Sequence, residues 1–177
     1  MRNSKLARLF ARLTLATAVA AGGVLAASAP AHATTGDWER ISAVYSGLVA
    51  AVPSPWTTNG LQVETAPYGV NAWNGQWKFI LVSGSTYTIE NRYSHQCLDT
   101  ENGNSLVSGA PVVQLPCDDT ASQTWVRTRD DVLKIWRISN GFSGLALAVE
   151  TGNAGGGAGF IQANNLPNNT RFQFQVW

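Results

Sequence analysis

A unit of about 48 residues occurs three times after residue 33, and this repetition constrains the fold more than any other feature of the sequence. Each copy opens with an aromatic residue shortly before an isoleucine, and the isoleucines are 48 and 49 residues apart: Ile41, Ile89 and Ile138. Each copy closes on Gln and Trp: Gln76-Trp77, Gln123-Thr124-Trp125 and Gln175-Val176-Trp177. A fixed period of this length is the mark of a fold built from repeated units. We therefore expect three units, spanning about residues 34–80, 81–128 and 129–177.

The units have the pattern of short β-strands. Near the end of the chain, Phe172, Phe174 and Val176 alternate with polar residues, which is the period-2 pattern of a half-buried strand. Residues 133–138 are rich in β-branched and aromatic side chains, and residues 83–85 and 129–131 have the composition of hairpin turns. No convincing amphipathic helix follows residue 33. The spacing predicts an all-β barrel or sandwich.

The first 33 residues have the composition of an export signal. A basic stretch, residues 1–12, precedes an apolar run, residues 13–27, and Ala31-His32-Ala33 offers a cleavage site of the small-x-small type. A transmembrane anchor needs about 20 apolar residues, whereas this run is shorter and contains Gly22-Gly23. We therefore expect cleavage near Ala33, secretion of residues 34–177 as one soluble domain, and no insertion into a membrane.

The charge that remains without this segment excludes one class of partner. Residues 1–33 hold four basic residues and no acidic ones, so the remainder carries eight Lys and Arg against eleven Asp and Glu. A net charge near −3 does not suit a basic nucleic-acid-binding protein. No nucleic-acid partner is expected.

Cys97 and Cys117 are the only cysteines. An even number of cysteines in an exported protein indicates one disulfide bond. Two reactive thiols are the alternative, but the sequence has no C-x-x-C motif to favour them. We interpret the pair as structural.

The three units resemble those of the ricin B-type lectins, which are also called family 13 carbohydrate-binding modules. The resemblance rests on the Q-x-W endings and covers essentially all of residues 34–177; it is strongest between Tyr87 and Trp125. It implies a β-trefoil, in which three four-stranded units share a pseudo-threefold axis. It also implies that the closing Gln and Trp residues are structural core elements: Gln76, Trp77, Trp125, Gln175 and Trp177.

The resemblance further implies where a sugar would bind. In the family an Asp accepts hydrogen bonds from sugar hydroxyls, an aromatic residue before the second Cys stacks on the sugar, and an Asn beside the closing Gln adds hydrogen bonds. The middle unit retains Asp99, Gln114 and Gln123, which are the candidate carbohydrate-binding residues. Leu115 stands at the stacking position and Ser122 at the Asn position.

The other two units lack this Asp. Alanine stands at the Asp position and near the stacking position in both: Ala51 and Ala66 in the first unit, Ala148 and Ala163 in the last. In the last unit Phe174 falls at the Asn position. In a second register, Phe172 takes the place of the Trp and Asn169 fills the Asn position.

Several of these residues have a purely structural interpretation as well. Asp99 could cap a turn instead of binding a ligand. The aromatic residues Trp56, Tyr68 and Trp73 could form a surface for sugar stacking or protein contact. Packing in the core or over one end of a barrel is the interpretation that we favour for them.

Catalysis has little support in the sequence. His95 is the only histidine after residue 33, and no metal-ligand spacing or cofactor fingerprint is present. We expect no enzymatic activity, no cofactor and no metal. The leading hypothesis is a monomeric, secreted module that binds a glycan or polysaccharide weakly through its middle unit. The alternative is a trefoil with degenerate sugar sites that serves in protein–protein interaction or inhibition.

Overall fold

The computed structural model describes residues 36–69, 72–150, 156–165 and 173–177. All of them belong to one compact unit, residues 32–177. The expected export signal lies outside the described residues, as does the second register through Asn169 and Phe172.

Within the described residues, twelve short strands follow one another in three groups of four. The first group contains β1 (Ile41–Ala43), β2 (Val49–Ala51), β3 (Glu64–Ala66) and β4 (Trp77–Ser83). The second contains β5 (Thr86–Asn91), β6 (Gln96–Thr100), β7 (Val112–Pro116) and β8 (Thr124–Asp130). The third contains β9 (Ile135–Asn140), β10 (Ala146–Val149), β11 (Phe160–Ala163) and β12 (Phe174–Val176). Three 3₁₀ turns accompany them: η1 (Trp73–Gly75), η2 (Glu101–Gly103) and η3 (Ala121–Gln123).

Six of these strands, the first and last of each group, form a barrel. The last strand of each group pairs antiparallel with the first strand of another, as β4–β5, β8–β9 and β12–β1. The pairs β5–β8 and β9–β12 and a bridge between Glu39 and Trp77 complete the circle. The pairing therefore closes on itself, which removes exposed sheet edges from the barrel.

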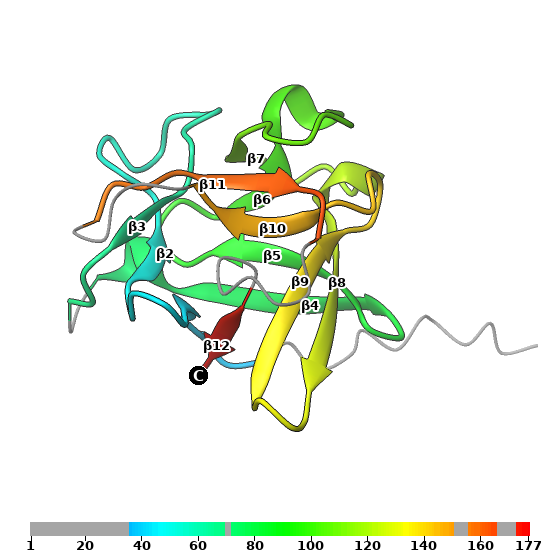
Figure 1. Ribbon diagram of the computed structural model, residues 1–177. Coiled ribbons are helices and arrows are strands. Elements are labelled where there is room, and N and C mark those ends of the chain that lie inside the picture. The colour runs from blue at the N-terminus through cyan, green and yellow to red at the C-terminus, as the bar shows by residue number, and fades with distance from the viewer. Residues whose placement is uncertain (1–35, 70–71, 151–155, 166–172) are drawn as a thin grey trace, which may run out of the picture. The chain divides into compact units, whose positions relative to one another are not determined.

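The other six strands form three hairpins over the barrel: β2–β3, β6–β7 and β10–β11 (Figure 1). Isolated bridges join each hairpin to the other two: Gln62–Val113, Pro111–Ile161 and Glu64–Gly159. A six-stranded barrel and three hairpins in threefold repetition constitute a β-trefoil. The expected fold is thus confirmed.

Two tryptophans at equivalent positions fill the core. Trp77 and Trp125, the first residue of β4 and the second of β8, have no exposed surface. Each indole N–H donates to a carbonyl of the second strand in its own group: Trp77 Nε1 to Ala50 O at 2.8 Å and Trp125 Nε1 to Leu98 O at 2.9 Å. The indole therefore contributes bulk to the core and satisfies a buried backbone oxygen.

The third core position is taken by Phe174, and the expectation that Gln175 and Trp177 would fill it is wrong. The strand register identifies the equivalent positions: Trp77 opposite Asn91, Trp125 opposite Asn140, and Phe174 opposite Ala43. Because Phe174 points into the core, Gln175 faces solvent in the alternation of β12. Trp177 is 54% exposed and packs on the surface against Tyr68 and Arg40.

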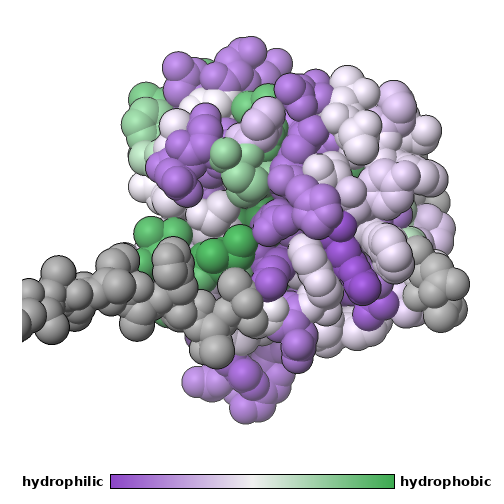
Figure 2. Space-filling model, turned by 180° about the vertical axis from the view of Figure 1, so that it is seen from behind, coloured by the Kyte–Doolittle hydropathy of each residue, from purple (hydrophilic) through white to green (hydrophobic). Residues whose placement is uncertain are grey.

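The surface is mostly polar but carries several exposed aromatic side chains. Figure 2 shows one face, on which hydrophilic and neutral residues predominate and strongly hydrophobic ones are confined to small areas. Trp56, Tyr68 and Trp73 are 41%, 44% and 49% exposed. The expectation that they pack in the core is therefore wrong, whereas a position over one end of the barrel stays a prediction. The exposed parts of these side chains are available for contact.

Candidate functional site

Asp99 lies in β6 and is almost completely buried, with 1% of its surface exposed. Its Oδ1 accepts a hydrogen bond from the N–H of Thr100 at 2.7 Å, whereas Oδ2 has no hydrogen-bond partner among the described residues. Gly103 of η2 lies close by: a Cβ atom there would be 3.7 Å from Oδ2 and 3.8 Å from Cδ1 of Leu115. The structure thus brings Asp99 and Leu115 together, beneath the segment that follows β6.

Burial raises the pKa of Asp99 above its ordinary value, because the ionised carboxylate has lost most of its hydration. The Ser122 side chain, the N–H of Thr100 and the Gln123 side chain act in the opposite direction by stabilising the charge. The carboxylate of Asp118 adds to the rise by repulsion. The net direction of the pKa shift is upward, because the loss of hydration outweighs these stabilising contacts.

A pocket of about 130 Å³ lies beside this carboxylate. Its lining includes Gly103 and Ser122, the same residues that adjoin Asp99, together with Asn104. Its aromatic wall is Phe142, which belongs to the third group of strands and is 46% exposed. The sequence motif did not identify Phe142, because the family pattern places the stacking residue within the same unit, at Leu115.

Gln123 is fully buried at the end of η3. Its Nε2 donates to Pro116 O at 2.8 Å, and its Oε1 accepts from the N–H of Asp118 at 3.0 Å. Gln123 is near enough to Asp99 to affect its pKa. Both of its polar atoms nevertheless hold the loop between β7 and η3, so its first role is structural.

Gln114 is not brought together with Asp99. In the β6–β7 register Asp99 faces Val113 and Leu98 faces Gln114, so the two polar side chains lie on opposite faces of the hairpin. Gln114 is fully buried, and its Nε2 donates to the backbone oxygens of Trp56 and Thr58 at 2.9 and 3.0 Å. This placement removes Gln114 from the candidate sugar site and makes it a structural residue.

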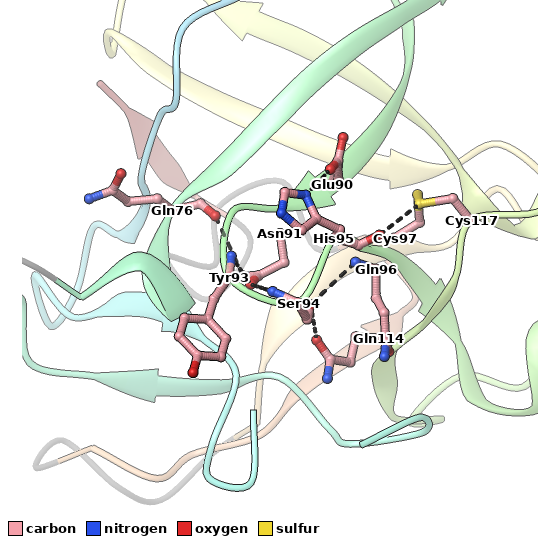
Figure 3. Close-up of polar contacts among 10 residues, drawn as sticks. All are labelled: Gln76, Glu90, Asn91, Tyr93, Ser94, His95, Gln96, Cys97, Gln114 and Cys117. Carbon is pink, nitrogen blue, oxygen red and sulfur yellow. Dashed lines mark hydrogen bonds and ion pairs between the residues drawn. A yellow bond between two sulfur atoms is a disulfide. The ribbon is translucent and has the colours of Figure 1, made fainter. Parts of the chain in front are cut away.

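The other polar atom of Gln114 belongs to a network that occurs twice. The Ser94 hydroxyl donates to Gln114 Oε1 at 2.7 Å (Figure 3), and the Ser143 hydroxyl donates to Gln162 Oε1 at the same distance. Gln162 also donates to two backbone oxygens, those of Ser105 and Val107. The serines are 49 residues apart and the glutamines 48, so the repeat period itself was a signal for this network.

The expected disulfide is present. Cys97 and Cys117 are joined, with Cα atoms 5.0 Å apart, and Sγ of Cys117 also lies 3.6 Å from His95 O (Figure 3). His95 is mostly exposed, and its Nδ1 is 2.8 Å from Oε1 of Glu90. The histidine is thus held by Glu90 on the surface.

The first and third groups lack the buried acid, as the sequence indicated. Ala51 in β2 and Ala148 in β10 lie where Asp99 lies in β6. Asn74 of η1 stands where Ser122 stands in η3, and its Nδ2 donates to Val52 O at 2.9 Å. The first group therefore retains the amide but not the Asp.

The described part of the chain contains neither a cluster of metal-binding side chains nor a membrane-spanning helix. No group of three His, Cys, Asp or Glu residues there could hold a metal ion. No helix among the same residues is long and apolar enough to cross a membrane.

Several solved structures share this fold. A designed threefold-symmetric protein, ThreeFoil, is 27% identical with a TM-score of 0.73, over 78% of this chain and 96% of that one. The Macrolepiota procera ricin B-like lectin in complex with lactose is 19% identical with a TM-score of 0.67, over 81% and 96%. An exo-β-1,3-galactanase from Clostridium thermocellum is 21% identical with a TM-score of 0.72, over 81% of this chain but only 30% of the galactanase.

Sequence comparison agrees with the fold. No curated protein sequence matches the chain. The model of the family described as ricin-type beta-trefoil lectin domain-like matches residues 29–115 and again residues 74–163. These two overlapping matches extend over most of the chain and include the whole of the second group of strands, so the protein belongs to the ricin-type β-trefoil lectin domain-like family.

Proposed function

We propose that this protein is a non-catalytic carbohydrate-binding module with a glycan site centred on Asp99. The observation that carries the proposal is the unpaired Oδ2 of a buried carboxylate beside a pocket with an aromatic wall, Phe142. A buried acceptor without a donor costs free energy, and a sugar hydroxyl that reached it would make a charge-assisted hydrogen bond. The ring of Phe142 offers an apolar face for the C–H groups of the same sugar.

Binding at this site is expected to be weak. Asp99 is covered by the segment that contains Gly103, so a sugar must displace part of it or reach Oδ2 from the edge of the pocket. Modules of this kind gain avidity from several linked sites. The first and third units have alanine, Ala51 and Ala148, at the position of Asp99. They therefore offer no further site of this type from which avidity could be gained.

The absence of catalysis is part of the proposal. His95, the one histidine after residue 33, is exposed on the surface and paired with Glu90. Among the described residues no second carboxylate is bonded to Asp99, and the nearby Asp118 caps Thr120 in its own loop. These contacts favour binding over acid–base chemistry, which needs an accessible pair of groups.

Export is proposed on the sequence of residues 1–33 alone. N-terminal sequencing of protein recovered from the culture medium tests it. A first residue at or next to Thr34 is the expected result, and protein that remains uncleaved inside the cell would overturn it.

A pull-down on immobilised glycans and insoluble polysaccharides tests the Asp99 site. We expect the protein to be retained, Asp99→Ala and Asp99→Asn to lose retention at this site, and Asp131→Ala to behave as the parent, because Asp131 is 80% exposed on a distant hairpin. Retention that is unaffected by both Asp99 variants removes this site. No retention of any protein would make the trefoil a scaffold for protein contacts instead.

A further inference from the structure

Three exposed aromatic side chains converge where the first group of strands meets the second. Trp56 comes from the loop after β2, Trp73 from η1, and Tyr93 from the turn after β5. They line a cavity of about 480 Å³ together with Ala72 and Asn74. The rings of Trp56 and Tyr93 meet edge to face, with centroids 4.8 Å apart and an interplanar angle of 77°. We call this cavity the aromatic pocket.

The turn that presents Tyr93 is held from inside the protein. The Oδ1 of Asn91 accepts hydrogen bonds from the N–H groups of Tyr93 and Ser94 at 3.0 and 3.2 Å. Ser94 is in turn fixed by Gln114, and the Tyr93 ring points away from this network (Figure 3). The position of the aromatic ring is therefore set before any ligand arrives, which lowers the entropic cost of binding.

Trp73 is also held in place from one side. The guanidinium of Arg92 lies 4.8 Å from the centre of its ring, and Nη1 of Arg92 donates to Oε1 of Gln76 at 2.6 Å. A cation over one face of an indole stabilises its orientation. Gln76, which the sequence motif marked as a core residue, thus supports a surface tryptophan through Arg92.

The aromatic pocket is the counterpart of the pocket beside Asp99, one unit earlier in the chain. Tyr93 corresponds to Phe142, since each follows a buried asparagine by two residues and donates the same hydrogen bond, from its backbone N–H to the Oδ1 of that asparagine. Asn74 of η1 lines the aromatic pocket, and its counterpart in η3, Ser122, lines the pocket beside Asp99. The earlier pocket is larger, about 480 Å³ against about 130 Å³, and two tryptophans line it.

A second pocket of about 380 Å³, with a mixed polar and apolar lining, continues from the aromatic one, since Trp56 and Asn74 line both. Its lining includes Ser54, Ala51 and Glu64. We call the two pockets together the first-unit groove. It has aromatic rings at one end and a carboxylate, a hydroxyl and an amide at the other.

Glu64 replaces the lost Asp from the neighbouring strand. In the β2–β3 register Ala51 faces Glu64, as Asp99 faces Val113 in the β6–β7 register, so the acid has changed sides within an equivalent pair. Directly paired residues project from the same face of a sheet. The third group has Ala148 opposite Ile161 and no acid at either position.

The polar atoms of the groove are available to a ligand. Glu64 is half-buried, and no described residue forms a hydrogen bond or ion pair with its carboxylate. The Nδ2 of Asn74 is used by Val52 O, which leaves its Oδ1 without a donor among the described residues. Of the described residues that line the two pockets, Glu64 alone is charged, so an acidic group is disfavoured at the end of the groove where Glu64 lies.

We propose that the first-unit groove binds a neutral oligosaccharide of two or more pyranose units. One sugar ring stacks with its C–H face on Trp56 and Trp73, and the hydroxyls of its neighbour donate to Glu64 and Asn74. A sugar fits both ends, because each ring combines an apolar face with a rim of hydroxyl groups. The inference rests on the proposed carbohydrate-binding function but places a second site, which does not use Asp99.

Calorimetric titration with lactose, cellotetraose, laminaritetraose and the acidic 6′-sialyllactose tests the proposal. The variants are Trp56→Ala, Trp73→Ala and Glu64→Gln, with Asp99→Ala for the other site and Trp177→Ala as the matched control, since Trp177 is an equally exposed tryptophan outside the groove. We expect at least one neutral sugar to bind, each groove Trp→Ala change to weaken it about tenfold, and Trp177→Ala to leave it unchanged within about twofold. Glu64→Gln should weaken the neutral sugar several-fold and reduce discrimination against 6′-sialyllactose.

Each outcome decides between the sites. Binding that Trp56→Ala and Trp73→Ala reduce but Asp99→Ala does not supports the groove. Binding that only Asp99→Ala reduces overturns the groove and keeps the proposed function. Absence of binding to the whole panel overturns both. If a proline-rich peptide binds instead and Trp73→Ala abolishes that binding, the occupant is a peptide and the sugar proposal fails.

Discussion

Ala51 and Glu64 face each other across the first hairpin, at the positions that Asp99 and Val113 hold in the second. A motif that is compared along a single strand predicts no sugar site in the first unit, because it detects only that the Asp is missing. The cross-strand register shows that the same face of the hairpin still carries a carboxylate. Comparison of paired strands is therefore needed to decide whether a degenerate repeat has lost its polar group or has moved it.

Asp99 should make stability fall as pH rises. Its folded-state pKa is raised, so the protonated form is favoured in the folded protein, and stability that is present below the unfolded pKa of about 3.9 is lost as pH rises through the folded value. Asp99→Asn removes this titration. We expect the variant to melt at a higher temperature than the parent at pH 7 and at a similar one at about pH 3.5.

Differential scanning calorimetry across this range measures the effect, with Asp131→Asn as the control because Asp131 is exposed. A variant that loses as much stability with rising pH as the parent would show that Asp99 is not the group responsible.

The equivalent hydrogen-bond networks of Gln114 and Gln162 should contribute equally to the free energy of unfolding. Each amide joins a serine hydroxyl and two backbone oxygens of the preceding loop, and neither glutamine has exposed surface. Removal of one leaves buried polar groups unsatisfied, at a cost of about 1–3 kcal/mol. We expect Gln114→Ala and Gln162→Ala to lower the free energy of unfolding by similar amounts in urea titrations.

Neither change should alter sugar binding at the Asp99 site. If Gln114→Ala abolished binding while Gln162→Ala destabilised the protein equally, the structural role assigned to Gln114 would be incomplete, and its contact with the ligand would have to be reconsidered.

The repeat period predicts the fold correctly. The wrong assignment of Trp177 as the third core residue arose because the period was not applied to that position. The interval from Trp77 to Trp125 is 48 residues, and from Trp125 to Phe174 it is 49, whereas Trp177 is 52 residues away. Constant spacing would have selected Phe174. The Q-x-W pattern selected Trp177 instead, because residue identity was given more weight than the register that the hairpins impose.

The aromatic pocket could not be predicted in the same way. Trp56 lies in the loop between β2 and β3, and Trp73 in a single 3₁₀ turn, so neither has a periodic pattern that indicates which way its side chain points. Their exposure follows from the loop conformations, which depend on distant contacts such as the hydrogen bonds from Gln114 to the loop backbone. Tyr93 and Phe142, by contrast, follow equivalent asparagines 49 residues apart, and this correspondence is visible in the sequence.

The disulfide should contribute substantially to stability. Cys97 and Cys117 close a loop with a sequence separation of 20 residues, for which loss of chain entropy in the unfolded state gives about 3 kcal/mol. For a domain of this size we expect the paired substitution Cys97→Ala and Cys117→Ala to lower the melting temperature by on the order of 10 °C. Calorimetry of the variant, and of the parent with and without reductant, measures the effect. Free thiols in the oxidised parent by mass spectrometry would contradict the assignment.

Replacement of Trp125 by Phe tests whether the indole hydrogen bond or only the ring volume matters in the core. The change deletes the donor to Leu98 O, now 2.9 Å away, and leaves a buried carbonyl without its partner and a small cavity. We expect a loss of about 1–3 kcal/mol in the free energy of unfolding. The third unit already uses Phe174 at the equivalent position, so the fold itself should persist.

Trp177→Phe is the control, with an expected change below about 0.5 kcal/mol because Trp177 lies on the surface. Equal stability of Trp125→Phe and the parent in denaturant titrations would mean that the repeated tryptophan serves only to fill space.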